Sequence, residues 1–167
     1  MEIIVINWEN NMRENKLKIC FVSSSGGHFE QLMMLRPLME KYNSYIVTEK
    51  LGYDVKVLDV PVRYVKTINR TDKLFFFEFI ENIFKAFSIV IKERPDLTIS
   101  TGALAAVPMM MWTKIFGGKV IYIESFAKID SPNISGKIAY KFADQFYVQW
   151  ENMKKFYPNA IYKGGIY

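Results

Sequence analysis

The sequence predicts an α/β domain in which a parallel β-sheet carries helices on both faces. Its 167 residues are half apolar, enough for one compact domain with a substantial core. Short runs rich in β-branched and aromatic residues alternate with longer stretches of helical periodicity. Such alternation joins parallel strands by right-handed crossovers, which place helices on both sides of the sheet. We expect residues 17–167 to form this single domain, after an N-terminal extension at residues 1–16 that ends in a polar linker.

The strands are expected at short, mostly apolar runs. They are residues 18–22, 44–48, 97–100, 120–123, 145–148 and 160–162. The pattern between residues 49 and 72 is ambiguous. Residues 55–60 and 62–65 could each form a short strand, but Pro61 excludes one continuous central strand.

The helices are expected in the segments between these strands. The first begins near residue 28, where apolar side chains recur at helical spacing as far as Met39. The later helices are residues 74–94, 104–116, 134–142 and 153–157. Pro95 ends the longest of them, because the residue before a proline disfavours helical geometry.

The helix at residues 74–94 is amphipathic, and we expect its apolar stripe to face the core. That stripe consists of Phe76, Phe79, Ile80, Ile83, Phe84, Phe87 and Ile91. The opposite stripe consists of Glu78, Glu81, Asn82, Lys85 and Lys92. A second interpretation stays open, because the start of the helix holds more aromatic residues than a core stripe needs and lies beside Arg70 and Lys73. In it, an aromatic cluster contacts an anionic membrane surface. The cluster is Phe75, Phe76, Phe77 and Phe79.

The composition argues against several classes of protein. One cysteine, Cys20, and one histidine, His28, provide neither a disulfide framework nor the ligands of a typical transition-metal site. The net charge of +5 is scattered, without the basic block of a nucleic-acid-binding tail. No stretch has the roughly 20 apolar residues of a membrane span, and residues 1–8 lack the basic start of a signal peptide. We therefore expect a cytosolic chain with peripheral membrane contact.

Residues 23–28, Ser-Ser-Ser-Gly-Gly-His, are the most informative stretch for function. A loop of this kind between a strand and a helix presents backbone N–H groups to an anion. It matches neither the P-loop nor the dinucleotide-binding pattern. Two interpretations remain: an anion site formed by Ser25, Gly26 and Gly27, or an ordinary capped turn. His28 could act as a general base or as a donor to a phosphate or sugar oxygen, or it could be structural.

Two further loops follow strands of the predicted sheet. Gly102 comes just after the strand at residues 97–100, and Glu124 and Ser125 come directly after the strand at residues 120–123. The carboxyl ends of parallel strands share one edge, so we expect all three loops to open there. A carboxylate at this edge could bind a sugar hydroxyl or act as a base, or it could simply cap the next segment.

Four blocks of sequence, beginning SSSGGHFEQLMML, PDLTISTGALAAVP, VIYIESFAKIDSP and YPNAIYKGGIY, together resemble the PssD/CpsF-type bacterial polysaccharide-biosynthesis proteins. Those proteins are relatives of the membrane-recruiting subunit of the two-part N-acetylglucosaminyltransferase of lipid-linked oligosaccharide synthesis. The same blocks resemble the N-terminal half of MurG-type GT-B glycosyltransferases. The resemblance implies a Rossmann-like, acceptor-side half of a GT-B fold.

The resemblance also implies a split enzyme. A separate catalytic subunit would bind most of the UDP-sugar, and the pair would transfer the sugar to a polyprenyl-diphosphate-linked saccharide in exopolysaccharide or capsule biosynthesis, on the cytoplasmic face of the membrane. By position, Gly26, Gly27 and His28 would face the acceptor diphosphate or reacting hydroxyl. Gly102 would line the cleft, and Glu124 with Ser125 would lie near the acceptor sugar.

Two functions therefore remain open. In the first, the chain contributes to catalysis with His28, or failing that Glu124, as the base, and needs neither a metal nor a cofactor because GT-B transfer uses dipoles and basic groups to stabilise the departing UDP. In the second, the chain is a non-catalytic scaffold that recruits the transferase to the membrane.

Overall fold

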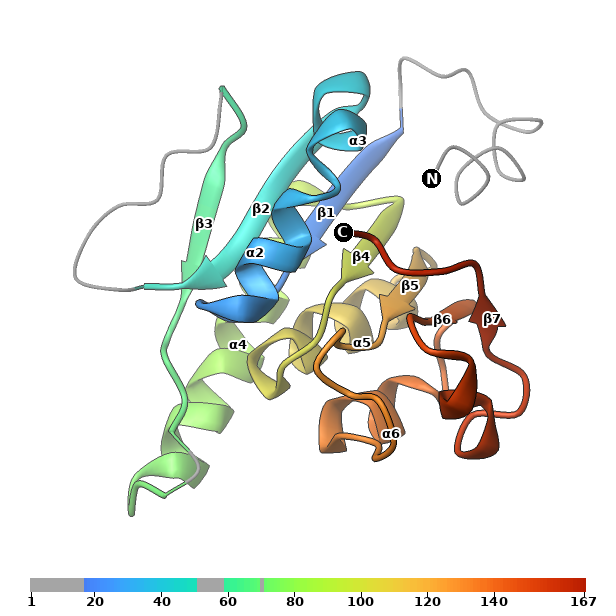
Figure 1. The fold of residues 1–167 in the computed structure, drawn as a ribbon. Coiled ribbons are helices and arrows are strands. Elements are labelled where there is room, and N and C mark those ends of the chain that lie inside the picture. The colour runs from blue at the N-terminus through green and yellow to red at the C-terminus, as the bar shows by residue number, and fades with distance from the viewer. Residues whose placement is uncertain (1–16, 51–58, 70) are drawn as a thin grey trace.

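The computed structural model describes residues 17–50, 59–69 and 71–167. Within these residues the chain forms a sheet of seven strands in the order β3-β2-β1-β4-β5-β6-β7 (Figure 1). Every neighbouring pair is parallel, which confirms the predicted fold class. The strands are β1 (Lys18–Val22), β2 (Asn43–Glu49), β3 (Val62–Val65), β4 (Leu97–Ser100), β5 (Lys119–Ile123), β6 (Gln145–Val148) and β7 (Ile161–Tyr162).

The ambiguous region contributes one described strand, β3 at the sheet edge, directly after Pro61. The alternative strand at residues 55–60 falls largely outside the described residues, as do the N-terminal extension and Arg70. The helical elements are α2 (Gly27–Met33), α3 (Arg36–Lys41), α4 (Phe75–Glu93), η2 (Leu104–Ala106), α5 (Val107–Ile115), α6 (Ile134–Ala139) and η3 (Glu151–Lys155). The first predicted helix is divided into α2 and α3, with Pro37 in the first turn of the second.

Two apolar cores lie on opposite faces of the sheet. Ile19 and Phe21 of β1 pack with α2 and α3, whereas Cys20 and Val22 pack with residues of α4 and α5. This division follows from the pleat, which points successive side chains to opposite faces. Figure 1 shows the resulting three layers, with α2 and α3 in front of the sheet and α4 and α5 behind it.

The predicted core stripe of α4 is wrong. The side chains that α4 buries are Asn82, Ala86 and Val90, while Phe76 and Phe84 are 64% and 68% exposed. Small side chains at Ala86 and Val90 let the helix approach the sheet closely. The polar Asn82 is tolerated because it makes two hydrogen bonds with the main chain of Lys66.

Exposed aromatic residues therefore remain along α4, and its first turn projects past the carboxyl ends of the strands (Figure 1). Among the described residues, no helix combines the length and the apolar character needed to cross a membrane.

Candidate functional site

The three predicted loops meet at the carboxyl ends of β1, β4 and β5. They border a cavity of about 360 Å³, called here the rim cavity. Its polar lining comes from Ser24, His28, Glu49, Ser125, Lys128, Asn133 and Ser135. Central strands β1 and β4 are neighbours from which the chain winds in opposite directions, and such a switch point is where open α/β sheets bind ligands.

His28 is held by a reciprocal pair of contacts with Thr101. The ring Nδ1 lies 2.9 Å from the carbonyl oxygen of Thr101, and the Thr101 hydroxyl donates to the carbonyl of His28 at 2.8 Å. A carbonyl can only accept, so this contact assigns the ring proton to Nδ1. In the neutral ring, Nε2 then keeps a lone pair. His28 can therefore accept a proton from a ligand in the cavity, or donate to an anion once protonated.

Gly102 provides the space that the His28 ring occupies. A Cβ at this position would lie 2.9 Å from Cε1 of His28 and 3.3 Å from the hydroxyl of Tyr122. The backbone also has φ 116° at Gly102, a conformation that other residues rarely adopt. The next residue, Ala103, lines the cavity with φ 74°, which is strained for a residue with a Cβ. Gly102 does not itself line the cavity, as its neighbour Ala103 does, and it contributes to the site by making room for the imidazole of His28.

Glu124 lies at the predicted edge, but its carboxylate is completely buried. One oxygen accepts from the Ser125 N–H at 2.8 Å and from Nδ2 of Asn133 at 2.5 Å, and the other accepts from the Tyr157 hydroxyl at 2.9 Å. Burial raises the pKa of Glu124, and the hydrogen bonds from Ser125 and Tyr157 oppose that rise only in part. The carboxylate therefore holds Ser125 and Asn133, which do line the cavity.

The glycine turn lies beside the rim cavity. Gly26 and Gly27 are exposed, and Gly26 has φ 73° before helix α2 begins. Ser25 is half-buried and donates through both its N–H and its hydroxyl to Glu49. Ser24 and His28, on either side of these residues, line the cavity itself.

Sequence reasoning missed Glu49, Lys128, Asn133 and Ser135, all of which line the cavity. Glu49 directly follows the expected strand at residues 44–48, so the rule that ligands bind at strand ends could have identified it. Lys128 and Asn133 come from the long loop after β5. Nothing in the local sequence indicates that this loop folds back over the cavity.

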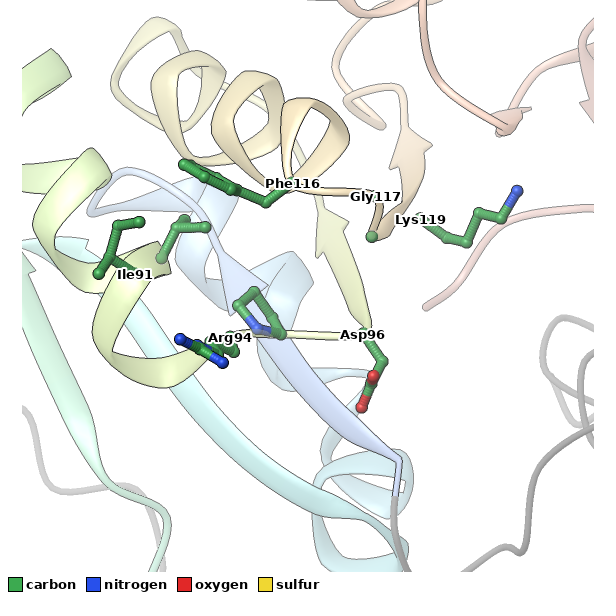
Figure 2. Close-up of a pocket in the computed structure, with 9 residues that line it drawn as sticks. Ile91, Arg94, Asp96, Phe116, Gly117 and Lys119 are labelled. Carbon is green, nitrogen blue, oxygen red and sulfur yellow. The ribbon is translucent and has the colours of Figure 1, made fainter.

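A larger cavity, of about 500 Å³, lies at the opposite edge of the sheet (Figure 2). The C-terminal ends of α4 and α5 enclose it with Ile91, Arg94 and Phe116, and Asp96 and Lys119 lie where β4 and β5 begin. This is the amino edge of the sheet. Two charged residues of its lining are engaged with other groups, because Asp96 accepts from the N–H of Lys18 at 2.8 Å and Lys119 pairs with Asp144 at 3.3 Å. The smaller rim cavity is the candidate site, because a histidine, a lysine and a carboxylate converge there.

The fold and the rim cavity define a Rossmann-like domain of the kind that forms one half of a GT-B enzyme. MurG of Acinetobacter baumannii aligns with a TM-score of 0.67 at 13% identity, over 81% of this chain and 42% of that one. A UDP-N-acetylglucosamine 2-epimerase from Rickettsia bellii aligns with a TM-score of 0.70 at 13% identity, over 90% of this chain and 45% of that one. These likenesses are of fold, and this chain spans less than half of either structure.

The chain belongs to the family described as Oligosaccharide biosynthesis protein Alg14 like, which matches residues 56–166, more than half of its length. A mouse relative named UDP-N-acetylglucosamine transferase subunit ALG14 is 26% identical over 180 residues. That alignment covers 90% of this chain and 83% of the mouse protein. The expected relation to the subunit of a two-part transferase is thereby confirmed at the level of the family.

Proposed function

We propose that this chain is the acceptor-side subunit of a split glycosyltransferase. A separate subunit would bind the UDP-sugar, and together they would transfer the sugar to a polyprenyl-diphosphate-linked saccharide. The family supports a partner subunit, because the mouse relative is named as one subunit of a UDP-N-acetylglucosamine transferase. The observation that carries a catalytic role is the Nδ1 contact of His28, which leaves Nε2 as the proton acceptor of a side chain that lines the rim cavity.

In the proposed reaction, the acceptor hydroxyl attacks the anomeric carbon of the UDP-sugar. Its proton passes to Nε2 of His28, and the bond from the anomeric carbon to the diphosphate oxygen breaks with its electron pair leaving on UDP. Lys128 and the turn at Ser25, Gly26 and Gly27 would bind the acceptor diphosphate. Ser125 would lie near the acceptor sugar.

Glu124 has a different role in this proposal from the base considered above. Its two oxygens already accept three hydrogen bonds, and its side chain is completely buried. It therefore acts by positioning Ser125 and Asn133 in the wall of the cavity, and His28 is the base.

The membrane contact is proposed at the first turn of α4. Phe76 and Phe77 are 64% and 69% exposed there, and Lys73 is exposed just before them. Phe75 and Phe79 stack on each other with ring centroids 6.1 Å apart, and the exposed pair meets edge to face with centroids 6.2 Å apart. This turn lies at the same end of the molecule as the strand ends (Figure 1), so a peripheral contact would bring the rim cavity to the lipid headgroups on the cytoplasmic face.

Within the family, we place the chain among the PssD/CpsF-type proteins of exopolysaccharide or capsule biosynthesis. The support is the set of four sequence blocks, which begins with the glycine turn and ends at the last residue. The donor would be a UDP-sugar held mainly by the partner.

The test is reconstitution of this chain with its partner subunit, using a lipid-linked acceptor and a UDP-sugar. His28→Ala and His28→Gln should each lower turnover by about 10²-fold or more, while the complex with the partner forms as before. His28 is the only histidine, so no second histidine can serve as a matched control variant. Complex formation measured on the same samples is the control instead. Unchanged turnover in both variants would contradict catalysis by His28 and favour the non-catalytic scaffold.

A further inference from the structure

We propose that Glu49 is a positioning residue of the rim cavity, one side chain that fixes two of its walls relative to each other. The inference rests on the proposed function only in calling the cavity an acceptor site. The contacts themselves are independent of that function.

Glu49 is the last residue of β2 and is 5% exposed. Its Oε2 accepts from the N–H of Ser25 at 3.2 Å and from the Ser25 hydroxyl at 3.1 Å. Its Oε1 accepts from the N–H of Ile68 at 3.2 Å. Ser25 belongs to the glycine turn, and Ile68 lies between β3 and α4 and lines the cavity. The two carboxylate oxygens therefore tie together two segments that are not neighbours in sequence.

The segment around Ile68 is anchored by other contacts. Asn82 of α4, which is completely buried, accepts from the N–H of Lys66 at 2.8 Å and donates to its carbonyl at 2.7 Å. The hydroxyl of Thr67 donates to the carbonyl of Lys50 at 3.3 Å. This segment is thus fixed to α4 and to the end of β2, and Glu49 extends the fixed frame to the glycine turn.

A carboxylate is required for this connection. Two main-chain N–H groups approach from different sides, and a carboxylate offers an acceptor to each. Among the described residues, no cation lies within ion-pair distance of Glu49, so these neutral donors are its partners. A glutamine of the same shape has one acceptor oxygen. In either orientation it would face one of the two N–H groups with its own NH₂ group.

The experiment measures amide hydrogen exchange at Ser25 and Ile68 in Glu49→Gln, with Glu40→Gln as the matched control. Glu40 is an exposed acid on α3 that pairs with Arg36 at 3.0 Å. In Glu49→Gln, exchange at one or both amides should accelerate by about tenfold or more. In Glu40→Gln, both amides should exchange at the wild-type rate. Unchanged exchange at both amides in Glu49→Gln would overturn the proposal, whether or not the proposed function is correct.

The second measurement uses the complex reconstituted with the partner subunit. In Glu49→Gln the KM for the lipid-linked acceptor should rise by about tenfold, while the KM for the UDP-sugar stays within about twofold. Ser25→Ala removes the hydroxyl contact with Glu49 and keeps the N–H contact, so it should give a smaller rise in the same KM. Faster exchange with an unchanged acceptor KM would overturn the positioning role.

The two measurements separate this inference from the proposed function. If the wild-type complex transfers no sugar, the proposed function fails. The exchange data would then still decide whether Glu49 connects the two walls.

Discussion

The Cα of Gly102 faces the imidazole of His28 so closely that a methyl group there would lie 2.9 Å from Cε1 and 3.0 Å from Nδ1. The ring cannot move away without losing its 2.9 Å contact with the carbonyl of Thr101. The position of the proposed base therefore depends on the absence of a side chain at residue 102.

Gly102→Ala should lower turnover of the reconstituted complex by about tenfold or more, because the ring is displaced from its tautomer-fixing contact. Gly117→Ala is the matched control, since Gly117 also has a positive φ, 85°, but has no atom within 4 Å of the added Cβ. Both variants should lose about 1 kcal/mol of stability from backbone strain. Equal loss of turnover in the two variants would show that strain, and not displacement of His28, is responsible.

The buried carboxylate of Glu124 gives a prediction about pH. Because burial raises its pKa in the folded state, the stability associated with its protonated form is present below the unfolded pKa of about 4.3. That stability is lost as the pH rises through the folded pKa. Glu124→Gln cannot ionise, and its amide can still accept from Asn133 and donate to the Tyr157 oxygen.

The free energy of unfolding of Glu124→Gln should therefore increase relative to that of the wild type as the pH rises from about 4 to 8, because only the wild type loses stability over this range. Urea unfolding across this range measures the difference. Glu151→Gln, at an exposed position in η3, is the control and should show a flat difference. A flat trend for Glu124→Gln would mean that folding leaves the pKa of the Glu124 carboxyl unchanged, and the opposite trend would mean that folding stabilises its ionised form.

The position of the site was predictable from sequence, but the partners of its residues were not. Gly102, Glu124 and the glycine turn were identified because each follows a strand, and parallel strands end at one edge. That Glu124 is buried depends on Tyr157, 33 residues later in the chain. A local pattern cannot reveal such a contact.

The prediction of the buried face of α4 was wrong for the same reason, because that face also depends on contacts distant in sequence. Periodicity shows that a helix has two different faces, but not which face a particular sheet accepts. Asn82 is buried because Lys66, 16 residues earlier, offers both an N–H and a carbonyl to its amide. Without that long-range pair, burying Asn82 would cost more than burying a phenylalanine gains.

The exposed pair at the start of α4 should be needed for membrane binding. The double change Phe76→Ser with Phe77→Ser should lower partitioning to vesicles containing anionic phospholipid by about tenfold or more, since each buried phenylalanine contributes about 1.5–3 kcal/mol. Stability should change little, because both rings are mostly exposed. Phe156→Ser is the control, since Phe156 directly follows η3, which lies between β6 and the edge strand β7. Equal partitioning of the double variant and the wild type would place the contact elsewhere.

Lys128 should determine affinity for the anionic acceptor. It lines the rim cavity, and its N–H donates to the carbonyl of Ser125 at 2.9 Å, so its backbone stays in place when the side chain is changed. In Lys128→Met, the KM for the diphosphate-linked acceptor should rise by about tenfold and lose much of its dependence on ionic strength. Lys154→Met, at an exposed position of η3, should leave both properties unchanged. The positive charge of Lys128 also lowers the pKa of Glu124, so its removal should steepen the loss of stability with rising pH. A rise confined to the KM for the UDP-sugar would contradict this role and indicate that Lys128 binds the donor.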